Sequence, residues 1–202
     1  MTIDVIETMA KYENICNYIH LPIQSGSNRI LKKMNRLHTR EEYINLVKKI
    51  RKIIPNCGIS HDMITGFPTE SEKDHQDTLS LMEEVKYDFG YMFAYSERPG
   101  TYAARNFKDD ISPEVKQRRL EEIITLQQKL SFERNKRFLN NYCSVLIDKT
   151  SKKSNDFWSG RTSENNVVVF PKYNFSLGDL VNVKVKNFTT ATLIGDINKV
   201  KV

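Results

Sequence analysis

The first 100 residues contain a short polar segment whose residue types could hold a small polar ligand. Gln24-Ser25-Gly26-Ser27 stands between an apolar, strand-like run and a helix-like stretch. A helix that begins there offers free backbone N–H groups, and the small residues let a ligand approach the backbone closely. Gln24 supplies both a hydrogen-bond donor and an acceptor. The spacing fits either the polar end of a cofactor or an ordinary capped turn.

Two later segments have the same character. In HDMITGFPTES (residues 61–71), Asp62 lies within a strand-like run, where an unpaired carboxylate would be costly to bury. We therefore expect it to have a partner, and a purely structural hydrogen bond is the alternative to a ligand. In YMFAYSERPGT (residues 91–101), Phe93 and Tyr95 could flank a flat base or could belong to the core. Ser96 would lie at the mouth of the sheet, and Arg98 is either a surface charge or a partner for a phosphate or carboxylate.

These segments are positioned by an alternation of strands and helices. The runs 15–24, 58–68 and 89–100 read as strands, and 39–55, 69–87 and 112–141 read as helices. Strand–helix repetition predicts an α/β fold with a parallel sheet. Parallel strands that are covered on both faces are nearly all apolar. Polar residues at the strand ends therefore indicate a barrel-like sheet with a functional site at the carboxyl ends of its strands.

Helix starts are marked by capping residues. Thr39 with Glu42, and Thr69 with Glu72, stand in capping-box spacing. Ser112 is followed by proline at the first helical position, and the last helix should be about 25 residues long or more.

From about residue 142 the pattern changes to short runs rich in Val, Ile, Thr and aromatic residues, separated by Ser, Asn, Gly and Lys. Four or five antiparallel strands in about 60 residues predict a small all-β barrel of the oligonucleotide-binding type. We therefore divide the chain into residues 1–141 and 142–202. The second part has nine Lys or Arg and five Asp or Glu, which gives +4 of the net charge of +6. This basic excess permits a nucleic-acid partner but does not require one.

The cysteines and the hydropathy suggest a reducing compartment. Cys16, Cys57 and Cys143 are scattered and form no CxxC or CxxxC group, so we expect buried thiols and no metal site within the chain. The sequence shows no secretory leader and no apolar run of the roughly 20 residues that span a bilayer. The expectation is a cytoplasmic protein with no membrane partner.

Four segments in this order give the chain a specific resemblance. HLPIQSGSNRILKKMNR, DMITGFPTESEKD, YMFAYSERPGT and GRTSENNVVVFP resemble the tRNA-modifying branch of the radical S-adenosylmethionine (radical-SAM) methylthiotransferases. The resemblance implies the second half of a partial (β/α) barrel followed by a TRAM domain, a small OB-like β-barrel that binds RNA. Thr69 replaces a more usual glycine, and His61 replaces Thr or Ser.

The resemblance also implies an activity. The intact enzyme would methylthiolate C2 of a prenylated adenosine beside the anticodon of tRNA, with S-adenosylmethionine as both radical source and methyl donor. Two 4Fe–4S clusters, N-terminal domains of the same polypeptide and a flavodoxin- or ferredoxin-type electron donor would be needed. The cluster cysteines are absent from this chain, so the chain alone is expected to be inactive and contains no residue that we assign as catalytic.

Site residues follow from the matching segments. The expected cofactor-binding residues are Gln24, Ser25, Ser27, Asp62, Phe93, Tyr95 and Ser96. The expected contacts to the tRNA anticodon stem-loop are Lys149, Lys152, Lys153, Arg161, Lys184 and Lys186. Three alternatives remain open: methylthiolation of threonylcarbamoyl-adenosine in tRNA, methylthiolation of a ribosomal-protein aspartate, and a free-standing, non-catalytic RNA-binding module.

Overall fold

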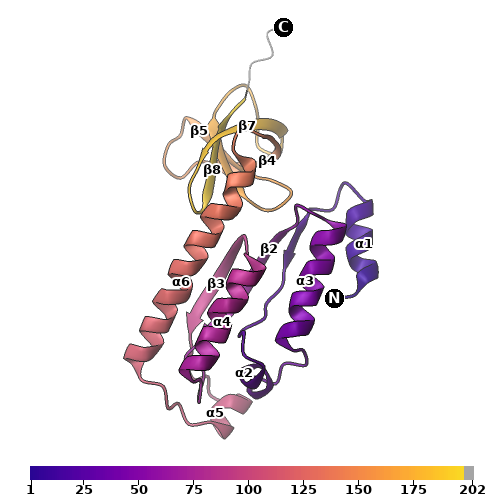
Figure 1. The fold of residues 1–202 in the computed structure, drawn as a ribbon. Coiled ribbons are helices and arrows are strands. Elements are labelled where there is room, and N and C mark those ends of the chain that lie inside the picture. Colours follow the sequence, from indigo (N-terminus) through magenta and orange to yellow (C-terminus); the bar gives the residue numbers. More distant parts are fainter. Residues whose placement is uncertain (198–202) are drawn as a thin grey trace. The chain divides into compact units, whose positions relative to one another are not determined.

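The computed structural model describes residues 1–197, and their contacts form two compact units (Figure 1). The sheet unit comprises residues 20–52 and 59–130. The barrel unit comprises residues 1–19, 53–58 and the chain from 131 onward. The predicted boundary between residues 141 and 142 stays a prediction.

A three-stranded sheet supports the first candidate site. Its order is β1 (Tyr18–His20), β2 (Gly58–Thr65), β3 (Phe89–Ala94), and β2 pairs with β3 in parallel register from Ser60↔Phe89 to Thr65↔Ala94. The predicted α/β class is confirmed. The first strand is shorter than predicted, because Pro22 has no N–H to donate to a ladder. The chain rejoins the sheet only at Gln24, through an isolated parallel bridge to Met63.

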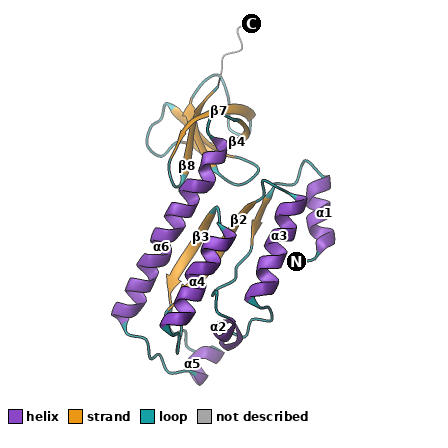
Figure 2. Ribbon diagram, viewed as in Figure 1, coloured by secondary structure: helices purple, strands orange, loops and turns teal. Residues whose placement is uncertain are grey.

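The helices and strands alternate as expected, with two additions (Figure 2). The predicted helices are α2 (Asn28–Lys33), α3 (Arg40–Ile53), α4 (Glu72–Val85) and α6 (Pro113–Asn135), followed by a 3-10 turn (Lys136–Phe138). Two helices were not predicted from the sequence: α1 (Ile3–Lys11) and the short α5 (Tyr102–Asn106). Helix α6 has 23 residues, and Ser112 Oγ accepts the N–H of Val115 at 3.4 Å.

Only one of the two predicted capping boxes is correct. Thr39 N–H donates to the Glu42 carboxylate at 2.8 Å, and Glu42 N–H donates to Thr39 Oγ1 at 3.2 Å. The predicted box at Thr69 is wrong, because α4 begins two residues later and is capped by Ser71 with Asp74. Thr69 itself has φ +68°, a left-handed conformation that cannot start a right-handed helix.

The core of the sheet unit lies between the sheet and three helices that contact one another. Arg51 of α3 donates to Val85 O at the end of α4, and His75 of α4 contacts Glu122 of α6 at 2.6 Å. His61 of β2 is fully buried and contacts Gln127 of α6 at 2.9 Å. Its ring leaves no space for a Cβ at position 90, which explains the glycine there.

The barrel unit contains a closed five-stranded barrel, as predicted. Its strands are β4 (Tyr142–Thr150), β5 (Phe157–Arg161), β6 (Val167–Pro171), β7 (Leu180–Phe188) and β8 (Thr192–Asp196), hydrogen-bonded in the order β4-β5-β6-β8-β7. The prediction that the strands are all antiparallel is wrong for one pair, because β6 and β8 are parallel. Alternate residues of β4 and β7 point inward, and Val145, Ile147, Val183 and Val185 pack with Phe170 in the barrel core. Closure leaves none of the five described strands with a free edge.

Candidate functional site

A cavity of about 670 Å³ lies in the sheet unit at the carboxyl ends of β2 and β3. This volume is in the range of pockets that bind a nucleoside-sized molecule. Five of the seven predicted cofactor residues line it: Gln24, Asp62, Phe93, Tyr95 and Ser96. The structure thus brings together residues from three segments that the sequence separates by up to about 70 positions.

Gln24 enters the cavity from a tightly held corner. Its backbone N–H donates to Asp62 O at 3.0 Å, and its carbonyl accepts from Ile64 N–H at 2.9 Å. Its φ of +79° turns the chain away from the sheet toward α2. Gly26 follows in close contact with α4, since a Cβ there would meet Asp77 O at 2.4 Å. The corner is therefore a rigid part of the cavity wall.

Ser25 and Ser27 are buried behind that wall and do not line the cavity. Ser25 Oγ lies 3.4 Å from Thr78 Oγ1 and accepts the N–H of Ser27 at 3.2 Å. Ser27 Oγ donates to Asp74 Oδ1 at 2.6 Å and caps α2. These contacts position the corner, and a direct contact of either hydroxyl with a cofactor stays a prediction.

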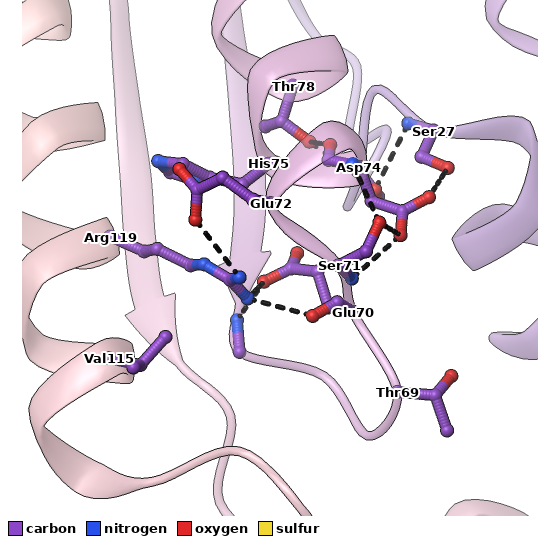
Figure 3. A network of polar contacts seen from close by, with 12 residues as sticks. Ser27, Thr69, Glu70, Ser71, Glu72, Asp74, His75, Thr78, Val115 and Arg119 are labelled. Carbon is purple, nitrogen blue, oxygen red and sulfur yellow. Dashed lines mark hydrogen bonds and ion pairs between the residues drawn. The ribbon is translucent and has the colours of Figure 1, made fainter.

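Asp74 joins the corner to the start of α4 (Figure 3). Its carboxylate accepts hydrogen bonds from Ser27, from Arg29, and from the backbone N–H of Ser71 at 2.8 Å. Burial alone would raise the pKa of Asp74, but these donors outweigh it and hold the pKa below its ordinary value. Asp74 therefore stays ionised and keeps the two helix starts together.

The partner expected for the Asp62 carboxylate is His20. Its carboxylate lies 3.4 Å from His20 Nε2, while His20 Nδ1 contacts Ser60 Oγ at 2.7 Å. The Tyr91 ring lies edge-on to His20, with 6.1 Å between the ring centroids. Asp62 thus belongs both to a hydrogen-bonded group on the sheet and to the cavity wall.

The two predicted aromatic residues occupy different environments. Phe93 is 54% exposed. Tyr95 packs edge-on against Phe67, with centroids 5.2 Å apart. Its hydroxyl is buried and has no hydrogen-bond partner within residues 1–197. A buried hydroxyl without a partner is costly to the folded state.

The turn after β2 forms another wall of the cavity and is fixed by a buried ion pair. Glu70 accepts the N–H of Gly66 at 2.6 Å and pairs with Arg119 of α6 at 2.9 Å (Figure 3). Arg119 also donates to the carbonyl of Glu70 at 3.0 Å. Burial raises the pKa of Glu70. Phe67, which lines the cavity, lies inside this closed turn.

Two cations of the cavity, Lys33 and Arg36, were not predicted from the sequence. Lys33, the last residue of α2, and Arg36, which follows that helix, line the cavity with Arg98, for which the sequence left two roles open. Basic residues at the end of a short helix are usually solvated, so their spacing carried no signal. Only the fold places them beside Tyr95 and Ser96.

The predicted RNA-contacting residues lie on the barrel in unequal environments. Lys152 and Lys153 are exposed, and their ammonium groups have no ion-pair partner in the described chain. Lys149 lies 3.4 Å from Asp148, Lys186 pairs with Asp196 at 2.7 Å, and Arg161 donates to Asn165 Oδ1 at 2.7 Å. Two further contacts join cations to rings.

In the first, Lys184 lies over the Tyr142 ring, 5.8 Å from its centroid. In the second, Lys172, which the sequence analysis missed, lies 4.2 Å from the centroid of the Trp158 ring. Arginine and lysine beside aromatic rings can contact both phosphates and bases, but the six predicted contacts are not tested by this geometry.

Among residues 1–197, no group of three His, Cys, Asp or Glu side chains is arranged to hold a metal ion. Cys57 is buried as expected, whereas Cys16 is exposed, so its predicted burial is wrong. Over the same residues, no helix combines the length and apolarity needed to cross a bilayer.

Sequence comparisons identify both parts of the chain. The Radical SAM superfamily matches residues 1–82, and the TRAM domain matches residues 136–198. The chain carries a radical-SAM segment and a TRAM domain. The predicted fold class is thereby confirmed, and the radical-SAM segment contains Gln24, Asp62 and the two turns that follow β1 and β2.

Individual relatives agree with the predicted resemblance. The tRNA-2-methylthio-N(6)-dimethylallyladenosine synthase of Christiangramia forsetii is 66% identical over 196 residues, which cover 97% of this chain and 41% of that protein. The protein of the same name from Flavobacterium johnsoniae is 60% identical over 192 residues, with 95% and 40% covered. The chain therefore spans about two fifths of the length of these relatives, and the resemblance to radical-SAM methylthiotransferases is confirmed.

A solved structure supports the fold alone. Coproporphyrinogen III oxidase (HemN) from Escherichia coli, a radical-SAM enzyme, superposes with a TM-score of 0.55 at 17% identity. The superposition covers 81% of this chain and 44% of that one.

Proposed function

We propose that this chain is part of an enzyme that methylthiolates C2 of a prenylated adenosine beside the anticodon of tRNA. The supporting observation is the 66% identity over 97% of the chain to a protein named for that reaction. The relatives cited above share this name, which favours the prenylated adenosine over threonylcarbamoyl-adenosine or a ribosomal-protein aspartate.

We infer that S-adenosylmethionine binds in the cavity of the sheet unit, which has a volume of about 670 Å³. Gln24 and Ser96 would hydrogen-bond its polar groups, and Phe93 would lie against the adenine. S-adenosylmethionine held there would supply the radical chemistry together with a 4Fe–4S cluster, and a second molecule would supply the methyl group. The residues of this chain orient the cofactor and exclude water.

The remaining parts of the proposal lie outside the chain. The two 4Fe–4S clusters would be held by cysteines of N-terminal domains, and a flavodoxin- or ferredoxin-type protein would donate electrons in the cytoplasm. The 202-residue chain alone should therefore assemble no stable cluster on anaerobic reconstitution. A stoichiometric cluster that responds to S-adenosylmethionine would contradict this division of roles.

The proposal is tested with the longer polypeptide that contains this chain. Incubated anaerobically with a reductant, S-adenosylmethionine and tRNA that carries prenylated adenosine, it should yield methylthiolated nucleoside detectable by mass spectrometry. Unprenylated tRNA and tRNA with threonylcarbamoyl-adenosine are the matched controls. Product from only the second control would overturn the proposed substrate, and RNA binding with no product from any tRNA would favour the non-catalytic module.

A further inference from the structure

The cavity in the sheet unit is lined by more positive charge than a small cofactor requires. Lys33, Arg36 and Arg98 line it, whereas Asp62 is the one acidic side chain among the described residues of the lining and lies 3.4 Å from His20. Lys33 donates to Thr69 Oγ1 at 2.7 Å. The guanidinium groups of Arg36 and Arg98 are exposed, and in residues 1–197 neither has a hydrogen-bond or ion-pair partner.

Both arginines lie in turns whose backbone conformation is fixed by hydrogen bonds. Arg36 N–H donates to Leu31 O at 2.9 Å, after Asn35 has reversed the chain with φ +57°. The carbonyl of Arg98 accepts the hydroxyl of Thr101 at 2.8 Å, and Thr101 caps α5. The two backbones are therefore fixed at the cavity while the guanidinium groups remain available for a ligand.

Exposed aromatic rings line the same cavity. Phe93 is 54% exposed and Tyr102 is 60% exposed. Guanidinium groups interleaved with open aromatic rings are the combination that contacts single-stranded nucleic acid, where cations meet phosphates and rings stack on bases. A single carboxylate, such as that of S-adenosylmethionine, is satisfied by one bidentate arginine and needs no second guanidinium or open ring.

We propose that Arg36 and Arg98 bind the phosphodiester groups of the RNA strand that flanks the modified nucleotide, and that Tyr102 stacks on a neighbouring base. This inference rests on the proposed function and adds an RNA-contacting site within the sheet unit to the one expected on the barrel. The cofactor and the RNA would then bind in the same cavity.

The test uses the full-length enzyme and an anticodon stem-loop RNA with prenylated adenosine. The double variant Arg36→Gln/Arg98→Gln is compared with Lys32→Gln/Arg105→Gln, which removes the same charge from exposed positions that do not line the cavity. The first variant should bind the RNA about tenfold more weakly. Its log–log salt slope should fall by about 1.4, at about 0.7 for each lost contact to a single strand.

Two further measurements show whether the arginines bind RNA phosphates or the cofactor carboxylate, and whether the Tyr102 ring contributes to RNA binding. The dissociation constant for S-adenosylmethionine should change less than twofold in the double variant, and Tyr102→Leu should weaken RNA binding without changing the salt slope. RNA binding equal to that of the control pair overturns the inference. Weakened cofactor binding with intact RNA binding also overturns it and assigns the arginines to the cofactor carboxylate. Wild-type enzyme that makes no methylthiolated product would instead refute the proposed function.

Discussion

Arg119 and Glu70 form an ion pair of 2.9 Å in which the two side chains are only 5% and 1% exposed. The pair joins α6 to the turn that follows β2, and Glu70 also accepts the N–H of Gly66. A carboxylate and a guanidinium this far from water must satisfy each other, because the loss of one partner leaves the other charge buried.

Arg119→Met should therefore lower the free energy of unfolding by about 3 to 5 kcal/mol, the usual cost of breaking a buried pair from one side. Arg118→Met is the matched control, since Arg118 is half exposed and pairs with Glu72 at the surface. It should cause only a small loss. Urea denaturation of the purified chain measures both, and equal losses would show that the burial of the pair is unimportant.

Gln24 supplies the cavity wall with an amide side chain, and its removal should weaken cofactor binding in the longer enzyme. One lost hydrogen bond to a charged group costs about 1.5 kcal/mol, or roughly tenfold in the dissociation constant for S-adenosylmethionine. Gln24→Gly is preferred to Gln24→Ala, because glycine accepts the φ of +79° without strain. Isothermal titration should show this loss with tRNA affinity intact. Unchanged cofactor binding would leave Gln24 a structural residue.

Thr69 holds a left-handed backbone that β-branched residues rarely adopt. Its hydroxyl accepts a hydrogen bond from Lys33 at 2.7 Å, so a substitution alters both strain and hydrogen bonding. Comparing Thr69→Gly with Thr69→Val separates the two effects, since both lose the hydroxyl and only valine keeps the strain. The glycine variant should be more stable than the valine variant by about 1 kcal/mol in urea denaturation. The opposite order would show that φ at this position is not strained.

His61 should make the stability of the chain depend on pH. Burial lowers the pKa of His61 to about 4, from an ordinary value of 6.5. Between these values the unfolded chain binds the proton and the folded chain does not, so its contribution is complete above pH 6.5 and declines as the pH falls toward 4. The full change is about 3 kcal/mol, at 1.36 kcal/mol for each pH unit.

His61→Asn should flatten this part of the pH profile whatever its absolute stability. His38→Asn is the control and should retain most of the slope, since His38 is only partly buried. Thermal denaturation from pH 4.5 to 7.5 gives the comparison. A His61→Asn profile as steep as that of the wild type would assign the slope to other groups.

The barrel should contribute electrostatic binding of RNA. Reversal of Lys152, Lys153 and Arg161 to Glu should weaken tRNA binding by the full enzyme and reduce the salt slope by about 2 to 3, at roughly 0.7 to 0.9 for each phosphate contact. Hydrogen abstraction from a saturating stem-loop substrate should persist, because the cavity lies in the sheet unit. Lost catalysis with unchanged tRNA affinity would place these residues near the reaction instead.

The sequence by itself determined the parts of this protein that depend on neighbouring residues. Strand–helix alternation predicted the parallel sheet, short β-rich runs predicted the barrel, and small polar corners at strand ends predicted five residues of the cavity. Capping succeeded at Thr39 and failed at Thr69, because two overlapping Ser/Thr–acid spacings compete there and the left-handed turn decides between them.

The tertiary structure alone decided which side chains line the cavity. Ser27 is turned from the cavity by a hydrogen bond to Asp74, 47 residues away, and no local pattern encodes that contact. Likewise, Arg36 and Arg98 share one cavity only because parallel pairing brings the carboxyl ends of the strands, and the turns after them, to one edge. Periodicity and capping act within a few residues, whereas burial and charge clustering depend on segments that meet only in the folded chain.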